Sequence, residues 1–570
     1  MKPRWIRNRR LAAASATVAV SAVAAAAAGV FDAPAALGSA HSAASTPLIM
    51  ESSQETTLTD NFNPYVSTGA ADTLGATSMI YETPLQFDLV RPLQAPYDFL
   101  AKSYTWGSGG KSITFTIRSG ITWSDGTPLT PADVAGTYNM LAKYPDTNTN
   151  GIPVTGATVS GQNVTVSFSS PAYTDLQYIG TTYIVPSSIY NMATDPGKAT
   201  ITAPVGTGPY VLSSFSPTAG VTLTANPRYW GGPWNVGGGP PAVSQVEFPL
   251  LASNSAVLSA LQNNQLDWAG NFLTGLSAFT SGAGHKVWFA GVNTNSLIPN
   301  LSTWPMNQLA VRQAVSRAID RNDLSKTGES GLEPPATNAS GIVLPNFAAD
   351  LAPAVKGATL SATANAKAAD AVLTKAGYTL KGKWYALKGK VVNVTISDPS
   401  DYADYAEDDK IMVQNLEAAH IEASFNGVSD TAWYASLANQ SYGSATSHWS
   451  NSSIQMYGVY QGWLDSTLSA KGTKNAASGD FEGLNNPALD KELRTLSAAT
   501  TTKATLKAIA PIEMYVAKNL PVIPTVYGAS FDEYNSAAFT GWPSATNPYE
   551  EGQPQQPNNE VVVLHLKPAS

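Results

Sequence analysis

The chain has 570 residues, with 33 basic and 41 acidic side chains and a formal net charge of −8. Hydrophobic residues make up 43% and aromatic residues 9% of it, which indicates a globular protein and excludes a disordered one. The acidic balance argues against a nucleic-acid partner. Because cysteine is absent, a disulfide framework, thiolate metal sites, thiol catalysis and a cysteine-linked lipid anchor are excluded as well.

Charged residues are scarce: they make up 13% of the chain, about half the usual share. Ser, Thr, Asn and Gly take their place as polar surface groups. One hypothesis is adaptation to an acidic exterior, where fewer carboxylates means fewer groups to protonate.

The N-terminus has the pattern of an export signal. A basic region with Lys2, Arg4, Arg7, Arg9 and Arg10 precedes an apolar, alanine-rich stretch at 11–30. Gly38-Ser39-Ala40 is a candidate cleavage site, so residues 1–40 are interpreted as a signal peptide and 41–57 as a flexible lead-in. The alternative is an uncleaved membrane anchor, since 11–30 approaches the length of a spanning helix.

The first clear elements lie in "ITFTIRSGITWSDGTPLTPADV", residues 113–134. Alternation of Ile113, Phe115 and Ile117 with polar residues predicts a strand, and Asp125-Gly126 predicts a turn. Thr130, Pro131 and Asp133 form a capping-box arrangement that starts a helix, with Val134, Tyr138 and Leu141 toward the core. A second alternating strand follows at 164–168.

Helices and strands continue to alternate further along the chain, which predicts α/β lobes. Helices are expected at 253–263, 307–324, 366–378 and around 408–419, and a strand at 391–397. The helix at 307–324 has an apolar face of Leu309, Val311, Ala314, Val315, Ala318 and Ile319, with its arginines expected on the opposite side.

No catalytic or metal-binding motif is present. The segment "GSGGKS" lacks the first glycine of a phosphate-binding loop, because Thr105 stands there. The five histidines show no H-E-x-x-H spacing, and G-x-S-x-G is absent. We therefore expect no enzyme activity, no metal and no cofactor.

Seven collinear phrases carry a family resemblance. The first is residues 113–134 with the "DFLAKSYTW" before them, and the others are "GTGPYVL", "NPRYWGG", "ALQNNQLDWA", "VRQAVSRAIDRNDL", "ADAVLTKAGY" and "NLPVIPTVY". In order and spacing the chain resembles the family 5 extracellular solute-binding proteins, the peptide- and oligosaccharide-binding receptors of ABC importers.

The resemblance implies a large bilobal α/β fold of the periplasmic-binding-protein type, class II, with a hinge near 300 and 520. Lobe I would comprise 58–90, 205–300 and 520–570, an extra inserted domain 91–204, and lobe II 301–519. It also implies a monomer outside the cytoplasm that delivers solute to a membrane permease. Trp123, Trp230 and Trp268 lie in family-wide phrases and are expected to pack in the interior.

The ligand class is read from 447–465, "SHWSNSSIQMYGVYQGWLD". Peptide receptors of the family commonly hold the ligand's amino terminus with an aspartate in a "W-x-A-D-Y" phrase, but Ser450, Asn451 and Ser452 follow Trp449 here. This departure favours an oligosaccharide, whose rings stack on aromatic faces. An oligopeptide stays the alternative if Asp465 or Asp401 supplies the charge. The candidate ligand-binding residues are Trp449, Trp463, Tyr457, Tyr460, Trp433, Asn295, Tyr81, Glu82 and Trp542.

Two other classes stay open at this point. A secreted hydrolase could use two carboxylates, although 41 acidic residues give that signal no specificity. A sensor on the same fold, without a transport role, is the other. Tyr457 and Tyr460, three residues apart, could instead pack on one helix face.

Overall fold

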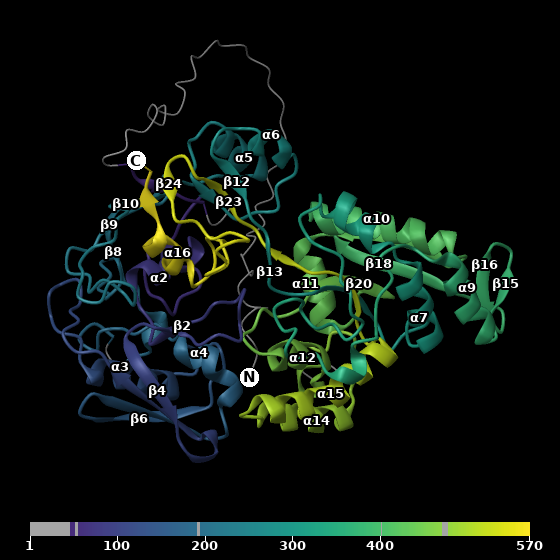
Figure 1. The fold of residues 1–570 in the computed structure, drawn as a ribbon, viewed down its shortest axis with the longest axis horizontal. Coiled ribbons are helices and arrows are strands. Elements are labelled where there is room, and N and C mark those ends of the chain that lie inside the picture. Colours follow the sequence, from purple (N-terminus) through teal and green to yellow (C-terminus); the bar gives the residue numbers. More distant parts are fainter. Residues whose placement is uncertain (1–45, 52–54, 191–193, 401, 470–476, 570) are drawn as a thin grey trace, which may run out of the picture.

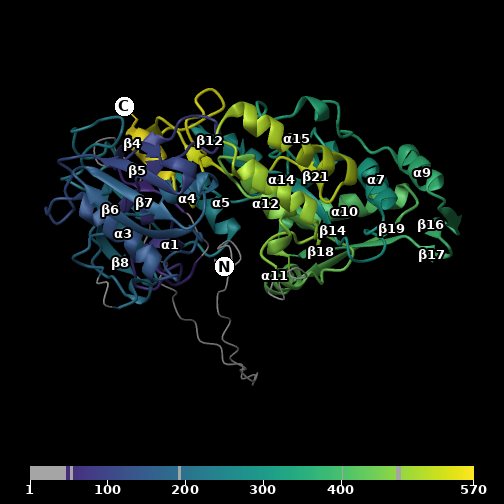
Figure 2. The same ribbon diagram turned by 90° about the horizontal axis from the view of Figure 1, so that it is seen from below.

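The computed structural model describes residues 46–51, 55–190, 194–400, 402–469 and 477–569. The predicted signal peptide, the start of the lead-in and Asp401 lie outside these residues. Two lobes lie side by side in both ribbon views (Figures 1 and 2). Within the described part of the chain, no helix combines the length and apolar character needed to cross a membrane.

The first lobe is built on three sheets, and one continuous hydrophobic core joins the first two. Their orders are β1-β10-β9-β8, β4-β5-β7-β6 and β11-β23-β12. The bounds are β1 Leu48–Ile49, β4 Ala101–Trp106, β5 Ser112–Ile117, β6 Val154–Ser160, β7 Asn163–Phe168, β8 Tyr210–Ser216, β9 Gly220–Ala225, β10 Gln245–Phe248, β11 Trp268–Ala269, β12 His285–Val287 and β23 Glu533–Asn535.

Shorter elements complete the first lobe and cover its sheets. They are α1 Ala70–Thr73, α2 Thr77–Ile80, β2 Leu85–Gln86, β3 Tyr97–Asp98, α3 Pro131–Lys143, α4 Leu176–Gly180, α5 Asn254–Gln262, α6 Leu276–Thr280, β24 Phe539–Thr540, α16 Asn559–His565 and β25 Lys567–Pro568. The C-terminal elements therefore return to the lobe in which the described chain begins (Figure 1).

The phrase at 113–134 folds as its pattern predicts. Ile113, Phe115 and Ile117 on β5 are buried, and their polar neighbours pair across the sheet. Helix α3 begins at Pro131, and the Asp133 carboxylate accepts a hydrogen bond of 3.0 Å from the backbone N–H of Thr130. The specificity of this phrase is therefore architectural.

The second lobe has one five-stranded sheet in the order β19-β18-β20-β14-β21, with an apolar cluster on each face. Helices α7, α9 and α10 pack on one face, and α11, α12, α14 and α15 on the other. The bounds are β14 Asn295–Pro299, α7 Leu309–Ala318, α9 Ala366–Lys375, β18 Asn393–Pro399, α10 Ala403–Ala418, β19 Glu422–Val428, α11 Asp430–Asn439, β20 Ala445–Trp449, α12 Met456–Leu464, α14 Pro487–Ser497, α15 Thr502–Asn519 and β21 Ile523–Val526. A small sheet of β15 Thr379–Lys381, β16 Trp384–Leu387 and β17 Lys390–Val391 is attached.

The helix predicted at 307–324 is wrong in its extent and in the place of its arginines. It ends at Ala318, and the Asp320 carboxylate caps a new turn, α8 (Arg321–Asp323). Arg312 and Arg321 are buried, because their guanidinium groups donate to main-chain carbonyls, among them those of Leu520 and Pro524. They satisfy carbonyls that the sheet and helix ends leave unpaired.

The lobes are joined where β13 (Ala290–Gly291) pairs with β22 (Ala529–Ser530) in an antiparallel ribbon between them (Figure 1). The chain enters the second lobe after β13, and it returns to the first through β22. We call 290–295 and 526–530 the crossing segments. The division of the chain into lobe I, an inserted domain and lobe II at the boundaries given above stays a prediction.

Candidate ligand site

The carboxyl ends of three parallel strands of the second lobe meet beside the crossing segments. Strand β18 is parallel to β19 and β20, and the last residue of β20, Trp449, pairs with Asn295 at the start of β14. Ligands of open α/β sheets bind outside the carboxyl ends of the strands. This edge is therefore where a solute between the lobes would meet the second lobe.

Six rings gather at this edge, and we call them the aromatic cluster. They are Tyr402, Tyr405, Trp433, Tyr434, His448 and Trp449. The Trp449 ring lies 5.9 Å from that of Trp433 and 6.2 Å from that of Tyr405, measured between centroids. Trp433, Tyr405 and His448 are buried, whereas Trp449, Tyr402 and Tyr434 are partly exposed. The exposed rings thus rest on a buried aromatic base.

The residues next to Trp449 in the sequence carry uncharged side chains. Burial lowers the pKa of His448 to about 4, so its imidazole is uncharged near neutral pH. The Ser450 hydroxyl accepts a hydrogen bond of 3.0 Å from the backbone N–H of Thr294, which ties the end of β20 to the crossing segment. Asn451, Ser452 and Ser453 follow with partly exposed side chains.

The first lobe touches this edge through α4. The Gln177 carboxamide oxygen accepts a hydrogen bond of 3.2 Å from the backbone N–H of Ile454, and the Ile454 side chain belongs to the first lobe's core cluster. Burial raises the pKa of the nearby Asp175 to about 6. Burial also raises the pKa of the Tyr457 hydroxyl, with Asp465 and Asp175 adding to the effect. Residues 173–177 and 454–457 therefore form one interface between the lobes.

The comparisons with known proteins decide the family. The family model described as "Bacterial extracellular solute-binding proteins, family 5 Middle" matches residues 95–471. The chain belongs to the family 5 extracellular solute-binding proteins. The predicted family and the predicted α/β fold class are thus confirmed.

Individual relatives agree with this membership. A protein named probable peptide-binding protein YejA, from Agrobacterium fabrum, is 24% identical over 528 residues, which cover 83% of this chain and 84% of that one. A periplasmic oligopeptide-binding protein of an oligopeptide ABC transporter from Thermotoga maritima has a TM-score of 0.81 at 21% identity, covering 92% of this chain and 99% of that one. The mannohexaose-bound structure of that protein has a TM-score of 0.74 and covers 91% and 98%.

A family 5 solute-binding protein is a transport receptor, not an enzyme, and the expectation of no catalysis follows from the family. Such a receptor binds its solute without covalent chemistry. Within the described residues, no group of three or more His, Asp or Glu side chains is placed to hold a metal ion.

The fold of this family 5 receptor brings together only some of the predicted ligand residues. Trp449 and Asn295 pair at the edge described above, Trp433 lies directly behind Trp449, and the partly buried Tyr457 lies at the lobe interface. Asn295 is only 9% exposed, and its side-chain amide donates a hydrogen bond of 2.7 Å to the Glu333 carboxylate.

Two predicted residues lie in the interior of the second lobe. The Tyr460 hydroxyl donates to the carbonyl of Ser340 at 3.0 Å. Trp463 is 4% exposed and packs against Gly341, where a Cβ would come within 2.6 Å of the ring. Gly341 also has a φ of +75°, so any other residue there would have a strained backbone as well as a clash with the Trp463 ring. Both aromatic side chains belong to the apolar cluster into which α12 packs.

Three more predicted residues lie inside the first lobe. Glu82 is fully buried and accepts hydrogen bonds from Tyr229 and Trp230, and burial raises its pKa to about 7. Tyr81 is also buried, and Trp542 stacks on Tyr534 with centroids 4.8 Å apart. A ligand role for these buried side chains stays a prediction without support from their placement.

Trp123, Trp230 and Trp268 are packed in the interior, as predicted from their phrases. They are 2%, 8% and 0% exposed, respectively. The expectation that these three tryptophans pack in the interior is thus confirmed.

Tyr402, Tyr405 and Tyr434 of the aromatic cluster were not predicted as candidate ligand residues. A usable signal was present, since Tyr402 and Tyr405 come shortly after the strand predicted at 391–397, and the ends of parallel strands are where ligands bind. His448 adjoins Trp449 in sequence and shares its surroundings.

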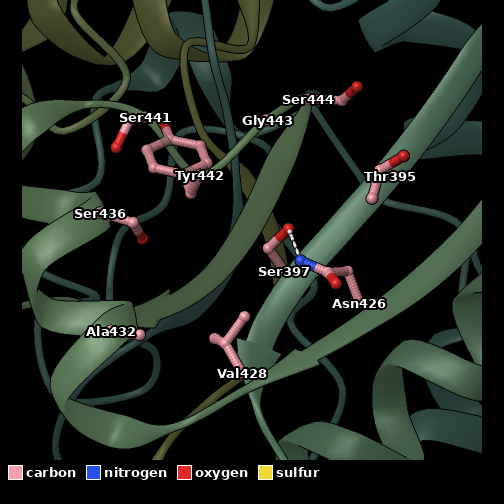
Figure 3. A pocket seen from close by; sticks show the side chains of 10 residues that line it. All are labelled: Thr395, Ser397, Asn426, Val428, Ala432, Ser436, Ser441, Tyr442, Gly443 and Ser444. Carbon is pink, nitrogen blue, oxygen red and sulfur yellow. Dashed lines mark hydrogen bonds between the residues drawn. The ribbon is translucent and has the colours of Figure 1, made fainter.

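One cavity of about 330 Å³ lies elsewhere in the second lobe, between α11 and the strands β18 and β19 (Figure 3). Hydroxyl groups line it, and the Asn426 amide donates to the Ser397 hydroxyl at 3.2 Å. All of its lining residues lie between 395 and 444. Because a solute there would touch one lobe only, this cavity does not have the geometry of a site that closes between two lobes.

Proposed function

We propose that this receptor captures a neutral oligosaccharide between its lobes and delivers it to the permease of an ABC importer. The observation that carries the proposal is the partly exposed Trp449, backed by Trp433 at the carboxyl end of β20 and followed by neutral side chains. Aromatic faces stack on the C–H faces of sugar rings, and amide and hydroxyl groups match sugar hydroxyls.

One of the acids considered for a peptide's amino group is already engaged within its own turn. Asp465, one candidate for holding a peptide's amino group, already accepts hydrogen bonds of 3.0 and 2.7 Å from the backbone N–H and hydroxyl of Thr467. The mannohexaose bound to the Thermotoga maritima protein gives a precedent for an oligosaccharide on this fold.

An oligopeptide is the second candidate, and Asp175 is the observation that favours it. Its carboxylate lies at the lobe interface, with a pKa raised to about 6 by burial and no ion-pair partner among the described residues. A peptide's amino group placed beside Asp175 would be attracted by the negative charge of its carboxylate. The name of the Agrobacterium fabrum relative also indicates peptide binding.

A thermal-shift titration with mannohexaose and with a nonapeptide separates the two candidates. A ligand at one hundred times its dissociation constant adds about 2.7 kcal/mol of stability. We expect mannohexaose to raise the melting temperature and the nonapeptide to leave it unchanged. Stabilisation by the peptide alone would replace the oligosaccharide proposal with the peptide one.

Trp449→Ala is expected to weaken binding of the stabilising ligand by about 1 kcal/mol or more, or at least about fivefold, because the stacking face is removed. Isothermal titration calorimetry measures this change. Asn426→Ala, in the cavity of Figure 3, is the matched control and should keep the original affinity. Equal affinity of Trp449→Ala and the unaltered protein would place the solute elsewhere.

We also propose that residues 1–40 direct export and that the receptor acts as a monomer outside the cytoplasm. The basic and apolar pattern of the N-terminus supports export. Solute uptake in cells lacking the partner permease distinguishes transport from a sensor role, since a transport receptor loses uptake with its permease.

A further inference from the structure

A short segment of the second lobe holds both crossing segments together. Residues 329–337, which we call the hinge strap, run beside β21 and β22. The backbone N–H of Ala336 donates to the carbonyl of Thr525 at 3.0 Å, and the N–H of Tyr527 donates to the carbonyl of Pro334 at 2.8 Å. Leu332 of the strap packs against an apolar cluster of the first lobe. The strap therefore contacts the returning crossing segment and the first lobe.

Glu333 is the polar centre of the strap. One of its carboxylate oxygens accepts a hydrogen bond of 2.7 Å from the backbone N–H of Ala529, at the start of β22. The other accepts one of 2.7 Å from the side-chain amide of Asn295, at the start of β14. A single carboxyl group thus joins the outgoing and the returning crossing segments.

A pair of carboxyl groups lies behind Glu333. Glu329 is 1% exposed, neither of its carboxyl oxygens has a hydrogen-bond partner among the described residues, and its nearest titrating neighbours include the carboxyl group of Asp408 on α10. Asp404, one helical turn before Asp408, faces the same interior. Glu329, Asp404 and Asp408 are called the hinge acids below; Glu333 is not counted among them, because the hydrogen bonds that it accepts at both oxygens favour its ionised form.

The groups that face the hinge acids from the surrounding elements are also acidic. Asp323 on α8 and Glu407 on α10 add negative charge, and Tyr405 lies among them. Lys410 pairs with Glu407 at 3.2 Å, and no ion pair to a hinge acid occurs in the described part of the chain. The guanidinium of Arg321 donates its hydrogen bonds to main-chain carbonyls instead.

Burial raises the pKa values of the hinge acids and of Glu333, and repulsion from neighbouring acids adds to the rise for Glu329, Glu333 and Asp408. The pKa of Asp408 rises to about 8, and those of Glu329 and Glu333 rise well above their usual range. Burial also raises the pKa of Asp404. Asp408 therefore holds its proton at acidic pH and loses it as the pH rises through about 8.

We propose that the hinge strap is a proton-controlled latch: when the hinge acids are protonated it fixes the relative position of the lobes, and when they lose protons it loosens. Unpaired negative charges buried beside the crossing segments repel one another and draw in water. The inference rests on the proposed closing of the lobes around a solute, and it predicts that this closing is better defined at acidic pH.

The distance between the lobes tests the latch in the solute-free protein. Because the chain has no cysteine, Ser277→Cys on α6 and Lys491→Cys on α14 give two exposed, specific sites for spin labels, one on each lobe. Pulsed electron paramagnetic resonance then gives the interlobe distance distribution. We expect a narrow distribution at about pH 4.5 and a broader one at about pH 8.

Glu329→Gln combined with Asp408→Asn mimics the protonated pair and should keep the distribution narrow at both pH values. Glu560→Gln removes a buried acid of the first lobe, beside Glu82, and should leave the pH response unchanged. Circular dichroism checks that each variant is folded, and Glu329→Gln alone provides a second variant if the double one is not. A distribution that does not change with pH in the unaltered protein would overturn the latch.

The latch would also be overturned if the variant with Glu329→Gln and Asp408→Asn responded to pH as the unaltered protein does. Neither result depends on a bound solute. Failure of mannohexaose and the nonapeptide to bind would count against the proposed function, whereas an unchanged interlobe distance would count against the latch alone.

Discussion

The free energy of unfolding is expected to be larger at about pH 4.5 than at about pH 8, opposite to the behaviour of a protein held by ion-paired carboxylates. The reason is the number of acids that the fold buries without a cation. In the described part of the chain, the one buried acid in an ion pair is Asp88, with Arg91 at 2.6 Å.

Burial raises the pKa of many of the other acids. It reaches about 7 for Glu51, Glu82, Asp267, Asp480, Glu513 and Glu551, and about 8 for Asp408. Each of these groups binds its proton more tightly in the folded protein than in the unfolded chain, where the pKa is near 4. Their contribution to stability is therefore complete below about pH 4 and is lost as the pH rises through about 7 to 8.

The contribution of these groups is large compared with the total free energy of unfolding. A pKa raised from 4.5 to about 7 corresponds to on the order of 3 kcal/mol for one group. Whole domains are stable by only about 5–15 kcal/mol, so a few such groups decide whether the fold survives. The hypothesis of an acidic working environment, drawn from the low charge content, agrees with this direction.

Urea denaturation at several pH values between about 4.5 and 8 measures the slope. Glu551→Gln, which keeps the shape of a protonated acid, should flatten part of it. Asp60→Asn, at an exposed acid of the first lobe, is the control and should leave the slope as it is. A maximum of stability above neutral pH would contradict both the direction and the hypothesis.

Local pattern was enough to predict the parts of the fold that depend on neighbours in sequence. Alternation placed Ile113, Phe115 and Ile117 on the buried face of β5, and the capping residues placed the start of α3. Each depends on contacts within a few residues, so the sequence carries them directly.

The site depends on pairing between distant segments, which periodicity does not report. Asn295 meets Trp449 because β14 pairs with β20. Glu82 is buried because Tyr229 and Trp230, far along the chain, bond to it. The burial of Arg321 on α8 was missed for the same reason, since the carbonyl group that it binds, that of Pro524, lies far along the chain on β21.

Trp433→Ala is expected to destabilise the protein by about 3–5 kcal/mol, whereas Trp449→Ala should cost clearly less. The two rings are neighbours, but Trp433 is 0% exposed and Trp449 is partly exposed. The Trp433 indole N–H also donates to the Thr446 hydroxyl at 2.7 Å, and that hydroxyl donates in turn to the Asp398 carboxylate. Removing the ring leaves a cavity and breaks this buried chain of hydrogen bonds.

Trp433→Phe separates the two contributions, since it keeps most of the ring volume and loses the N–H. We expect about 1–3 kcal/mol for this change, measured by urea denaturation at about pH 5. Binding of the stabilising ligand should be weakened by Trp449→Ala in folded protein. Trp433→Ala should weaken ligand binding only to the extent that the loss of its ring shifts the exposed rings above it. If Trp433→Ala instead left stability within about 1 kcal/mol of the unaltered protein, Trp433 would not be the base on which the exposed rings rest.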